Sequence, residues 1–194
     1  MAGKVGKKGK LIVFSAPSGT GKSTLSKIVL ERLPAVVFSV SATTRKQRDG
    51  EKEGINYYFL SHEEFEKKVR NGGFIEHEYF FGNHYGTLLD KTEEIIASGK
   101  SVLFDLDVKG ALNLKNLFGS EALLVFIRPP GIEVLEERLR GRESESPEQL
   151  RARLERAQFE LGFADKFDVT VVNDNLDQAA DTITALVGDF ISTT

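Results

Sequence analysis

The chain has 194 residues, 40% of them hydrophobic and 28% charged, which is the balance of a single folded domain with a sizeable core. The net charge of −3 argues against a general nucleic-acid binder, and no apolar run is long enough to be a membrane span or a signal peptide. The chain has no cysteine and so no disulfide or thiolate metal site, which is compatible with the cytoplasmic location that we expect.

The chain begins with a lysine-rich stretch, residues 1–10, which contains no acid and is expected to be a flexible tail. A phosphate-attracting arm is the alternative. A buried strand is predicted at 10–15, a helix with an apolar face at 24–33 and a second buried strand at 35–40. Apolar strands separated by helices are typical of a parallel sheet.

The composition changes after residue 40. The segment 41–56 is polar, charged and punctuated by glycine, which suggests an insertion for binding. The elements predicted after it are a strand at 57–60, a helix from the capping box of Ser61 and Glu64 to Gly72, a strand at 74–80 and a turn at 82–86.

Helices and apolar strands alternate again in the C-terminal half. The predicted elements are a helix at 88–98, a strand at 101–107, a helix at 108–118, a strand at 122–127, a helix pair interrupted at 141–147, a strand at 168–172 and a C-terminal helix. The alternation predicts an α/β fold whose parallel sheet is flanked by helices on both faces.

The loop between the first strand and the first helix carries a phosphate-binding pattern. It reads Ala16-Pro17-Ser18-Gly19-Thr20-Gly21-Lys22-Ser23, with Thr24 next. Small residues let successive backbone N–H groups close round a phosphate at a helix N-terminus. Lys22 can reach the β and γ phosphates of a nucleoside triphosphate, and the Ser23 hydroxyl can coordinate Mg²⁺. A glycine turn without chemical meaning is the alternative, but the strand–loop–helix context favours a P-loop NTPase fold.

The insertion offers a second site for an anion. Arg45 and Arg48 lie three apart, with Ser41 before them and Tyr57 after them. Two guanidinium groups and a phenol hydroxyl can enclose a phosphate through charge-assisted hydrogen bonds. A solvated charged loop is the alternative reading of these arginines.

Two acids, Asp105 and Asp107, end the predicted strand at 101–107. Because they are two residues apart, both should face the same way, near the phosphate loop. The alternative is that such an acid caps a nearby helix.

Five segments of the chain resemble the guanylate kinase family. They read APSGTGKST, SATTRKQRDGEKEGINYYF, FIEHEYFFGNHYGT, DLDVKGA and RLRGR, in the order and nearly the spacing of that family, between about Leu11 and Asn175. The resemblance implies Mg²⁺-dependent transfer of the γ-phosphate of ATP to GMP. It also implies three parts: a core at 11–40, 96–137 and 156–194, a mixed α+β GMP-binding insertion at 41–95 and a helical lid at 138–155.

The resemblance also implies roles for individual residues. The GMP phosphate would be held by Ser41, Arg45, Arg48, Tyr57 and Tyr85. The guanine would be read by Glu76 and Thr87, with Asp107 contacting GMP or, through water, the Mg²⁺, and Asp105 in support. ATP would be bound by residues 16–24 and Asn173. Catalysis would depend on Lys22, Arg45 and the lid residues Arg138, Arg142 and Arg153, for which a salt-bridged helix is the alternative.

The predicted guanine readers can also be argued from the chemistry of the base. Guanine presents an N1–H and an N2 amine side by side, and the Glu76 carboxylate can accept from both. Adenine has an acceptor at N1 and no N2 amine. Leaving a buried polar partner unpaired costs about 1–3 kcal/mol, or roughly ten- to over a hundredfold against AMP. An exposed strand carboxylate is the alternative for Glu76.

Four positions depart from the family pattern: Ala16, Gln47, Asn56 and Glu143. None removes a predicted contact with phosphate or base, so we expect them to affect rates and lid behaviour. Two other functions are possible. A ribose-1,5-bisphosphate phosphokinase would have no use for Glu76 and Thr87, and a guanylate-kinase-like binding module tends to lose the working phosphate loop. The expected substrates are therefore ATP and GMP, with dGMP also accepted. The protein is expected to be a monomer or a homodimer.

Overall fold

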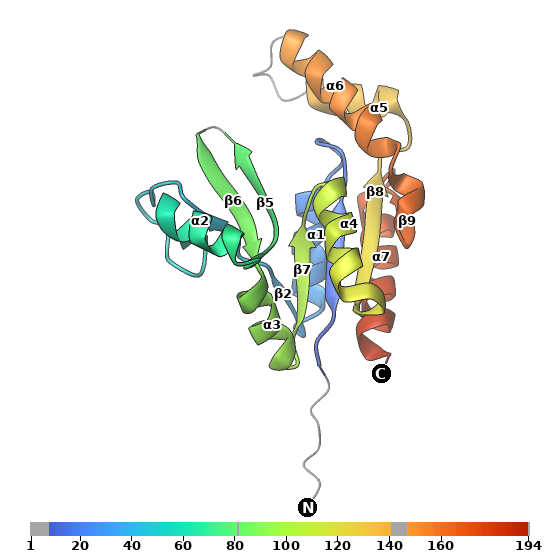
Figure 1. Cartoon of the computed structure of the whole chain (residues 1–194). Coiled ribbons are helices and arrows are strands. Elements are labelled where there is room, and N and C mark those ends of the chain that lie inside the picture. The colour runs from blue at the N-terminus through green and yellow to red at the C-terminus, as the bar shows by residue number, and fades with distance from the viewer. Residues whose placement is uncertain (1–7, 81, 141–146, 194) are drawn as a thin grey trace, which may run out of the picture.

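The structure, a computed structural model, describes residues 8–80, 82–140 and 147–193. Figure 1 shows three parts: a central sheet between helices, a smaller sheet with a helix to one side, and a helix pair above the upper end of the central sheet. Among the described residues, no helix is long and apolar enough to cross a membrane.

The central sheet of the described chain is parallel throughout. Its strands are β1 (Leu11–Ser15), β2 (Val36–Phe38), β7 (Ser101–Asp105), β8 (Ala122–Arg128) and β9 (Val169–Val172). They lie in the order β2-β7-β1-β8-β9, so β1, which leads into the phosphate loop, is central. Ligands of such sheets bind beyond the carboxyl ends of the strands, which here lie below the helix pair in Figure 1.

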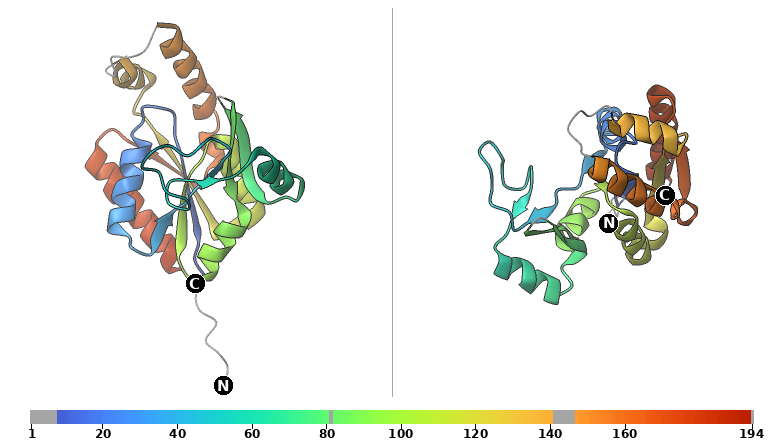
Figure 2. Two further views of the ribbon diagram at one scale, coloured as in Figure 1. Left: turned by 90° about the vertical axis from the view of Figure 1, so that its left-hand side faces the viewer. Right: turned by 90° about the horizontal axis from the view of Figure 1, so that it is seen from above.

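Helices cover both faces of this sheet because successive strand residues point to opposite faces. The covering helices are α1 (Lys22–Arg32), α3 (Leu89–Ala97), α4 (Val108–Phe118) and α7 (Leu176–Ser192). Ile12 and Phe14 of β1 pack on the side of α1 and α7, while Leu11 and Val13 pack on the side of α3 and α4. The left view of Figure 2 shows these two helix layers. All four side chains are completely buried, and each such burial contributes about 1.5–3 kcal/mol.

The insertion forms a second, mixed sheet. Its strands are β3 (Ala42–Thr43), β4 (Tyr58–Phe59), β5 (Phe74–Phe80) and β6 (Asn83–Leu88), in the order β4-β3-β6-β5, and α2 (His62–Arg70) packs on it. The predicted capping box is present: Ser61 Oγ accepts from the Glu64 N–H, and the Glu64 carboxylate accepts from the Ser61 N–H. Phe65 of α2 is completely buried in a small core of this part.

The helix pair consists of α5 (Ile132–Arg140) and α6 (Pro147–Leu161), with a core of Leu135, Leu139 and Ala157. Short 3₁₀ turns follow α4 at Gly119–Glu121 and α6 at Ala164–Lys166. The position at which the helix pair was expected to break, 141–147, lies outside the described residues except for Pro147, which begins α6.

The predicted α/β fold class is confirmed, and most predicted elements are present within a few residues. The turn predicted at 82–86 is wrong over most of its length. Only Gly82, with φ 79°, has a turn conformation, and β6 begins at Asn83. The reason is tertiary: β6 pairs with β5 on one side and with β3 on the other, and these ladders override its glycine-rich local pattern. The residue boundaries proposed for core, insertion and lid stay a prediction.

Candidate active site

The phosphate loop joins β1 to α1 at the carboxyl edge of the central sheet. Gly19 and Gly21 have φ values of 89° and 93°, in the left-handed region that glycine tolerates best. A Cβ at Gly19 would also lie 2.9 Å from the Leu139 side chain, and one at Gly21 would lie 2.6 Å from Asn173 Nδ2. Both glycines are therefore required by the shape of the loop as well as by its packing.

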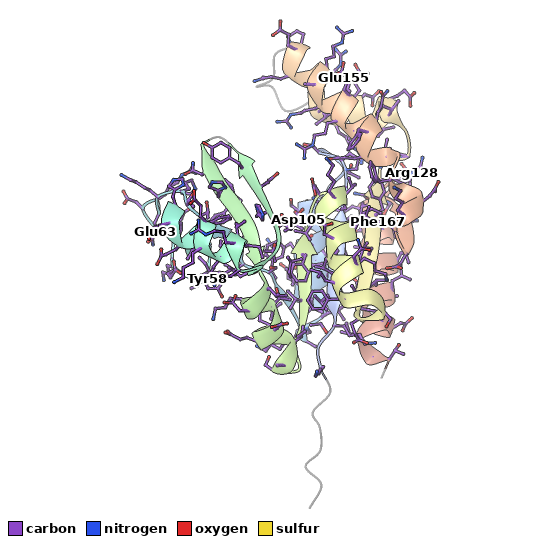
Figure 3. All side chains as sticks on the ribbon, in the orientation of Figure 1. Tyr58, Glu63, Asp105, Arg128, Glu155 and Phe167 are labelled. Carbon is purple, nitrogen blue, oxygen red and sulfur yellow. The ribbon has the colours of Figure 1, made fainter. Side chains whose placement is uncertain are left out.

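A cavity of about 600 Å³ opens over this loop. Its lining includes Pro17, Gly21, Lys22, Ser23 and Thr24, which were expected to bind the triphosphate. Lys22, which begins α1, forms an ion pair with Asp105 at the end of β7. Figure 3 shows Asp105 at the upper end of β7. In the free protein the Asp105 carboxylate thus holds the lysine at the loop, and its supporting role in the reaction stays a prediction.

Asn173, just after β9, braces the phosphate loop from the other side. It is only 5% exposed, and its Nδ2 donates to the Thr20 carbonyl oxygen at 2.7 Å. Arg138 of α5 donates in turn to the Asn173 carbonyl oxygen at 3.1 Å. Two predicted site residues therefore meet behind the loop. Contact of Asn173 with adenine stays a prediction from the family resemblance.

A second cavity, of about 920 Å³, lies between the insertion and the core. It is lined by residues that were expected to bind GMP: Ser41, Tyr57, Glu76, Tyr85 and Asp107. The rings of Tyr57 and Tyr85 meet edge to face, with centroids 6.1 Å apart. The volume is within the usual range of small-molecule sites. The two cavities share Glu78, Asp107 and Arg156, so ligands in them would be neighbours.

The two predicted guanine readers are in contact. Thr87 Oγ1 donates to Glu76 Oε1 at 2.7 Å, across the paired strands β5 and β6. Burial raises the pKa of the Glu76 carboxyl, the hydrogen bond from Thr87 opposes this, and the negative charges of Glu78 and Asp107 raise the pKa further. A carboxylate held in a cavity wall at such a cost is unlike the exposed strand acid of the alternative reading.

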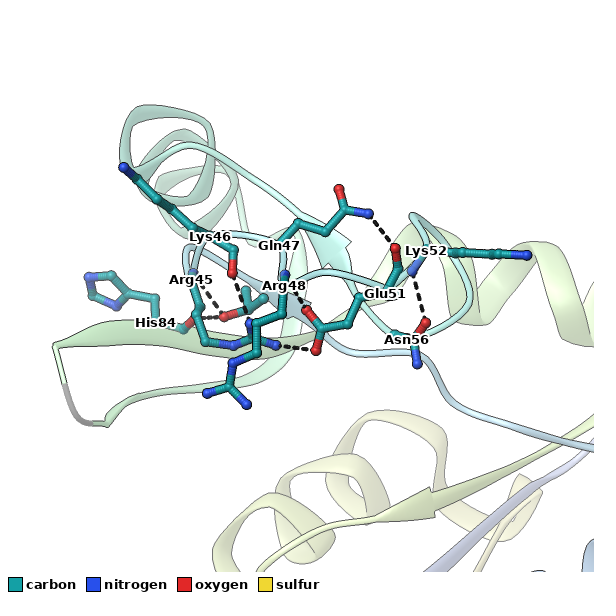
Figure 4. Close-up of polar contacts among 9 residues, drawn as sticks. Arg45, Lys46, Gln47, Arg48, Glu51, Lys52, Asn56 and His84 are labelled. Atoms are coloured by element: carbon teal, nitrogen blue, oxygen red, sulfur yellow. Dashed lines mark hydrogen bonds and ion pairs between the residues drawn. The ribbon is translucent and has the colours of Figure 1, made fainter.

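The arginine loop of the insertion is organised by Glu51 (Figure 4). Its Oε1 accepts from Arg45 NH2 at 2.7 Å, and its Oε2 accepts from the backbone N–H of Arg48 at 2.8 Å. These bonds lower the pKa of the Glu51 carboxyl, the Arg45 bond most strongly. The Arg45 guanidinium also lies over the Tyr57 ring, 5.3 Å from its centroid. Arg45 thus contacts Tyr57, which lines the cavity between the insertion and the core.

Asn56, one of the departures from the family pattern, also stabilises this loop. Its Oδ1 accepts from the Lys52 N–H at 2.9 Å. The Gln47 amide donates to the Glu51 carbonyl oxygen. An amide at either position is therefore compatible with an ordered loop.

Asp107 both caps a helix and lines the two cavities. Its Oδ1 accepts from the Gly110 N–H at 2.8 Å, so it caps α4 as the alternative reading has it. It also lines both cavities, which is where the predicted contact with GMP or Mg²⁺ requires it. The cap uses one carboxylate oxygen and leaves the other available.

The predicted lid arginines have different positions. Arg153 of α6 donates to Ser18 Oγ at 3.1 Å and lines the phosphate-loop cavity. Arg138 faces the carbonyl oxygen of Asn173, behind the loop. Arg142 and the neighbouring departure Glu143 lie outside the described residues.

Two residues of the site were missed by sequence reasoning. Glu51 could have been found, because an acid that follows two arginines within one short loop is a natural partner for both. Arg156 of α6 lines both cavities and binds Glu160 through Nε at 3.0 Å. It stands in an (i, i+4) pair typical of any charged helix, so nothing in the sequence distinguishes it.

A phosphate loop beside a second cavity that shares part of its wall is the arrangement of a class: P-loop kinases that pass a phosphoryl group between two bound molecules. Comparison with known proteins gives the family. The family model that matches is described as guanylate kinase and covers residues 8–189. The chain belongs to the guanylate kinase family, within the nucleoside monophosphate kinases.

The reported relatives match over nearly their whole length. The chain is 59% identical over 193 residues to a guanylate kinase of Chlorobium luteolum, covering 100% of this chain and 98% of that protein. It is 42% identical over 185 residues to a guanylate kinase of Bacteroides thetaiotaomicron, covering 95% and 91%. A crystal structure of guanylate kinase from Anaplasma phagocytophilum is similar with a TM-score of 0.72 and 33% identity, covering 97% and 89%. The predicted family and kinase class are confirmed.

Proposed function

We propose that the chain transfers the γ-phosphoryl group of ATP to the phosphate of GMP, and of dGMP, giving ADP and GDP or dGDP. The observation that carries the proposal is the Glu76 carboxylate, which lines a cavity adjoining the phosphate loop and is bonded from behind by Thr87, itself only 2% exposed. Neither a ribose bisphosphate nor a phosphopeptide would need a half-buried carboxylate at this place.

The pair explains the choice of base. In the free protein Thr87 occupies one side of the Glu76 carboxylate. The remaining acceptor positions can take the N1–H and N2 amine of guanine together. AMP would place the N1 lone pair of adenine against this carboxylate. The raised pKa of the Glu76 carboxyl reflects a loss of solvation that two guanine donors would offset.

The transfer itself needs alignment and charge compensation from the protein. An oxygen of the GMP phosphate attacks the γ-phosphorus, and the bond to the oxygen bridging the β and γ phosphates breaks, so that ADP leaves with that oxygen. The acceptor is already anionic, and no general base is required. Lys22, released from Asp105 by the β and γ phosphates, would offset the charge, with Arg153 above the loop. Ser41, Arg45, Arg48, Tyr57 and Tyr85 would hold the acceptor phosphate.

The residues present fit a Mg²⁺ ion bound with the triphosphate. Ser23 and Asp107 line the same cavity and offer oxygen ligands, the kind that Mg²⁺ prefers. In the described ranges no group of three acidic or histidine side chains could hold a metal alone, which fits an ion that keeps waters and phosphate oxygens as ligands. Ser23, and Asp107 through water, would hold the ion. When bound, it would neutralise part of the phosphate charge. The expectations of a cytoplasmic monomer or homodimer stay predictions.

The proposal is tested by incubating the purified protein with Mg-ATP and one acceptor at a time: GMP, dGMP, AMP or ribose 1,5-bisphosphate. We expect GDP and dGDP in amounts equal to the ADP formed. Lys22→Ala should lower kcat at least a hundredfold, because it removes a charge that acts on the transferred group. Lys27→Ala, an exposed lysine of the same helix, is the matched control and should have no effect. Transfer to ribose 1,5-bisphosphate in preference to GMP, or no transfer at all, would contradict the proposal.

A further inference from the structure

Arg156 lies at the junction of the two nucleotide cavities. Its side chain lines both the cavity over the phosphate loop and the cavity of the insertion. Glu78 and Asp107 are the other residues common to the two linings, and both are acids. Among the described lining residues, Arg156 is thus the one cation that faces both sites.

The guanidinium of Arg156 is fixed on one side and open on the other. Its Nε donates to Oε1 of Glu160, which is only 8% exposed and comes one helical turn later in α6. This bond fixes the base of the guanidinium group. Within the part of the chain that the structure describes, the two outer nitrogens form no hydrogen bond. An arginine held in this way presents a fork that suits a carboxylate.

Glu78 is the acid that could use this fork. It lies on β5, two residues from Glu76, so both carboxylates belong to one face of the strand. It is exposed, and its charge raises the pKa of the Glu76 carboxyl. The hydrogen bond to Glu160 raises the pKa of Arg156 most, and the charges of Asp107 and Glu78 add to the effect. Arg156 and Glu78 therefore attract each other across the cavities.

The two residues belong to different parts of the molecule. Arg156 is on a helix of the pair above the central sheet, and Glu78 is on the insertion (Figure 1). Asp107, the third acid of the junction, belongs to the core and already caps α4. Glu78 is thus the acid that a movement of the insertion would bring toward Arg156.

We propose that Arg156 is a positioning residue that pairs with Glu78 when GMP fills its cavity, and that the pair links the insertion to the helix over ATP. This inference rests on the proposed function. The pair would hold the acceptor site closed and would also partly neutralise the acid that faces Glu76. It would act on the binding of GMP, and the chemistry at the phosphates would be left to other residues.

A double-mutant cycle tests the proposal. We expect Arg156→Gln and Glu78→Gln each to raise KM for GMP about two- to fivefold, the range of a partly exposed ion pair, with little change in kcat. The double variant should be no worse than the worse single variant, because both changes remove one interaction. The charge-reversed pair Arg156→Glu with Glu78→Arg should recover part of the loss. Arg151→Gln, an exposed arginine of the same helix, is the matched control.

A stability measurement separates a lost interaction from a loss of folding. Arg156→Gln leaves the buried Glu160 without its partner, so thermal unfolding of each variant is measured. If Arg156→Gln unfolds, the KM for GMP of Glu78→Gln, which changes an exposed strand position, tests the proposal. Additive effects of the two substitutions on KM would overturn the proposal. A fall in kcat for Arg156→Gln with no effect of Glu78→Gln would also overturn it, because Arg156 would then act on the phosphates. If the wild-type protein did not phosphorylate GMP, the proposed function itself would fail. That outcome is separate from the mutant cycle, which tests only the pairing of Arg156 with Glu78.

Discussion

In the proposed function, recognition of the base depends on Glu76. Burial raises its pKa above the ordinary glutamate value of about 4.3. On acidification, the carboxylate that would accept from guanine is therefore protonated at a higher pH than an ordinary glutamate would be. We predict that kcat/KM for GMP falls on acidification with a limb above that value. The GMP phosphate also titrates, with a pKa of about 6. The informative quantity is therefore the ratio of wild type to Glu76→Gln, in which the phosphate cancels. A ratio that does not change with pH would contradict the assignment.

The same burial has a consequence for stability. Because the pKa of Glu76 is raised in the folded state, the folded protein binds this proton more tightly than the unfolded chain. Stability is then lost as the pH rises through the folded pKa. Glu76→Gln removes this loss, so we predict a higher Tm than wild type at pH 8, without substrates, and a smaller difference at about pH 4, below the ordinary glutamate pKa of about 4.3. Scanning calorimetry at both pH values measures it. A variant less stable than wild type at pH 8 would show that the carboxylate is not strained.

In the proposed function, Glu51 would act on GMP binding through Arg45 and Arg48. It accepts from the Arg45 guanidinium and from the Arg48 backbone. Glu51→Gln removes a charge-assisted bond, and we expect KM for GMP to rise about tenfold while KM for ATP stays the same. Glu63→Gln, an exposed acid on α2, is a suitable control. An equal effect on both KM values would indicate general unfolding of the insertion.

At the scale of elements, the phosphate loop is held by its neighbours as much as by its own sequence. Asn173, at the end of β9, satisfies the carbonyl of Thr20 in a buried place. Asn173→Ala would leave that carbonyl unpaired, and we predict a loss of about 1–3 kcal/mol in stability together with a higher KM for ATP. Chemical denaturation and kinetics on the same variant check both parts. Asn116→Ala, exposed on α4, should change neither. Unchanged stability would mean that water replaces the amide.

The elements that the sequence predicts well are those with strong local signals. β1, β7 and β8 are continuous apolar runs, and the start of α2 carries a capping box. β3 and β6 have no such signal. β3 has two residues inside a polar stretch, and β6 contains Gly86, so both exist because neighbouring strands pair with them. Such pairing joins residues far apart in the chain, which periodicity does not report.

At the scale of the whole molecule, the site is assembled from three parts that the sequence presents separately. The phosphate loop could be predicted from its own motif, and Glu76 with Thr87 only through the family resemblance, because a lone strand acid carries no local sign of its role. The structure brings this pair together across two strands. The ion pair of Lys22 with Asp105 and the position of Arg156 depend on how the parts meet, which no local pattern encodes.

The most direct test of the account is the ratio of kcat/KM for GMP to kcat/KM for AMP, measured with Mg-ATP for the wild type and for Glu76→Gln. We predict that the wild type strongly prefers GMP, and that the substitution lowers kcat/KM for GMP about ten- to a hundredfold while leaving that for AMP the same or higher. If the substitution left the ratio unchanged, Glu76 would not read the base, and the assignment of the second cavity to GMP would be wrong.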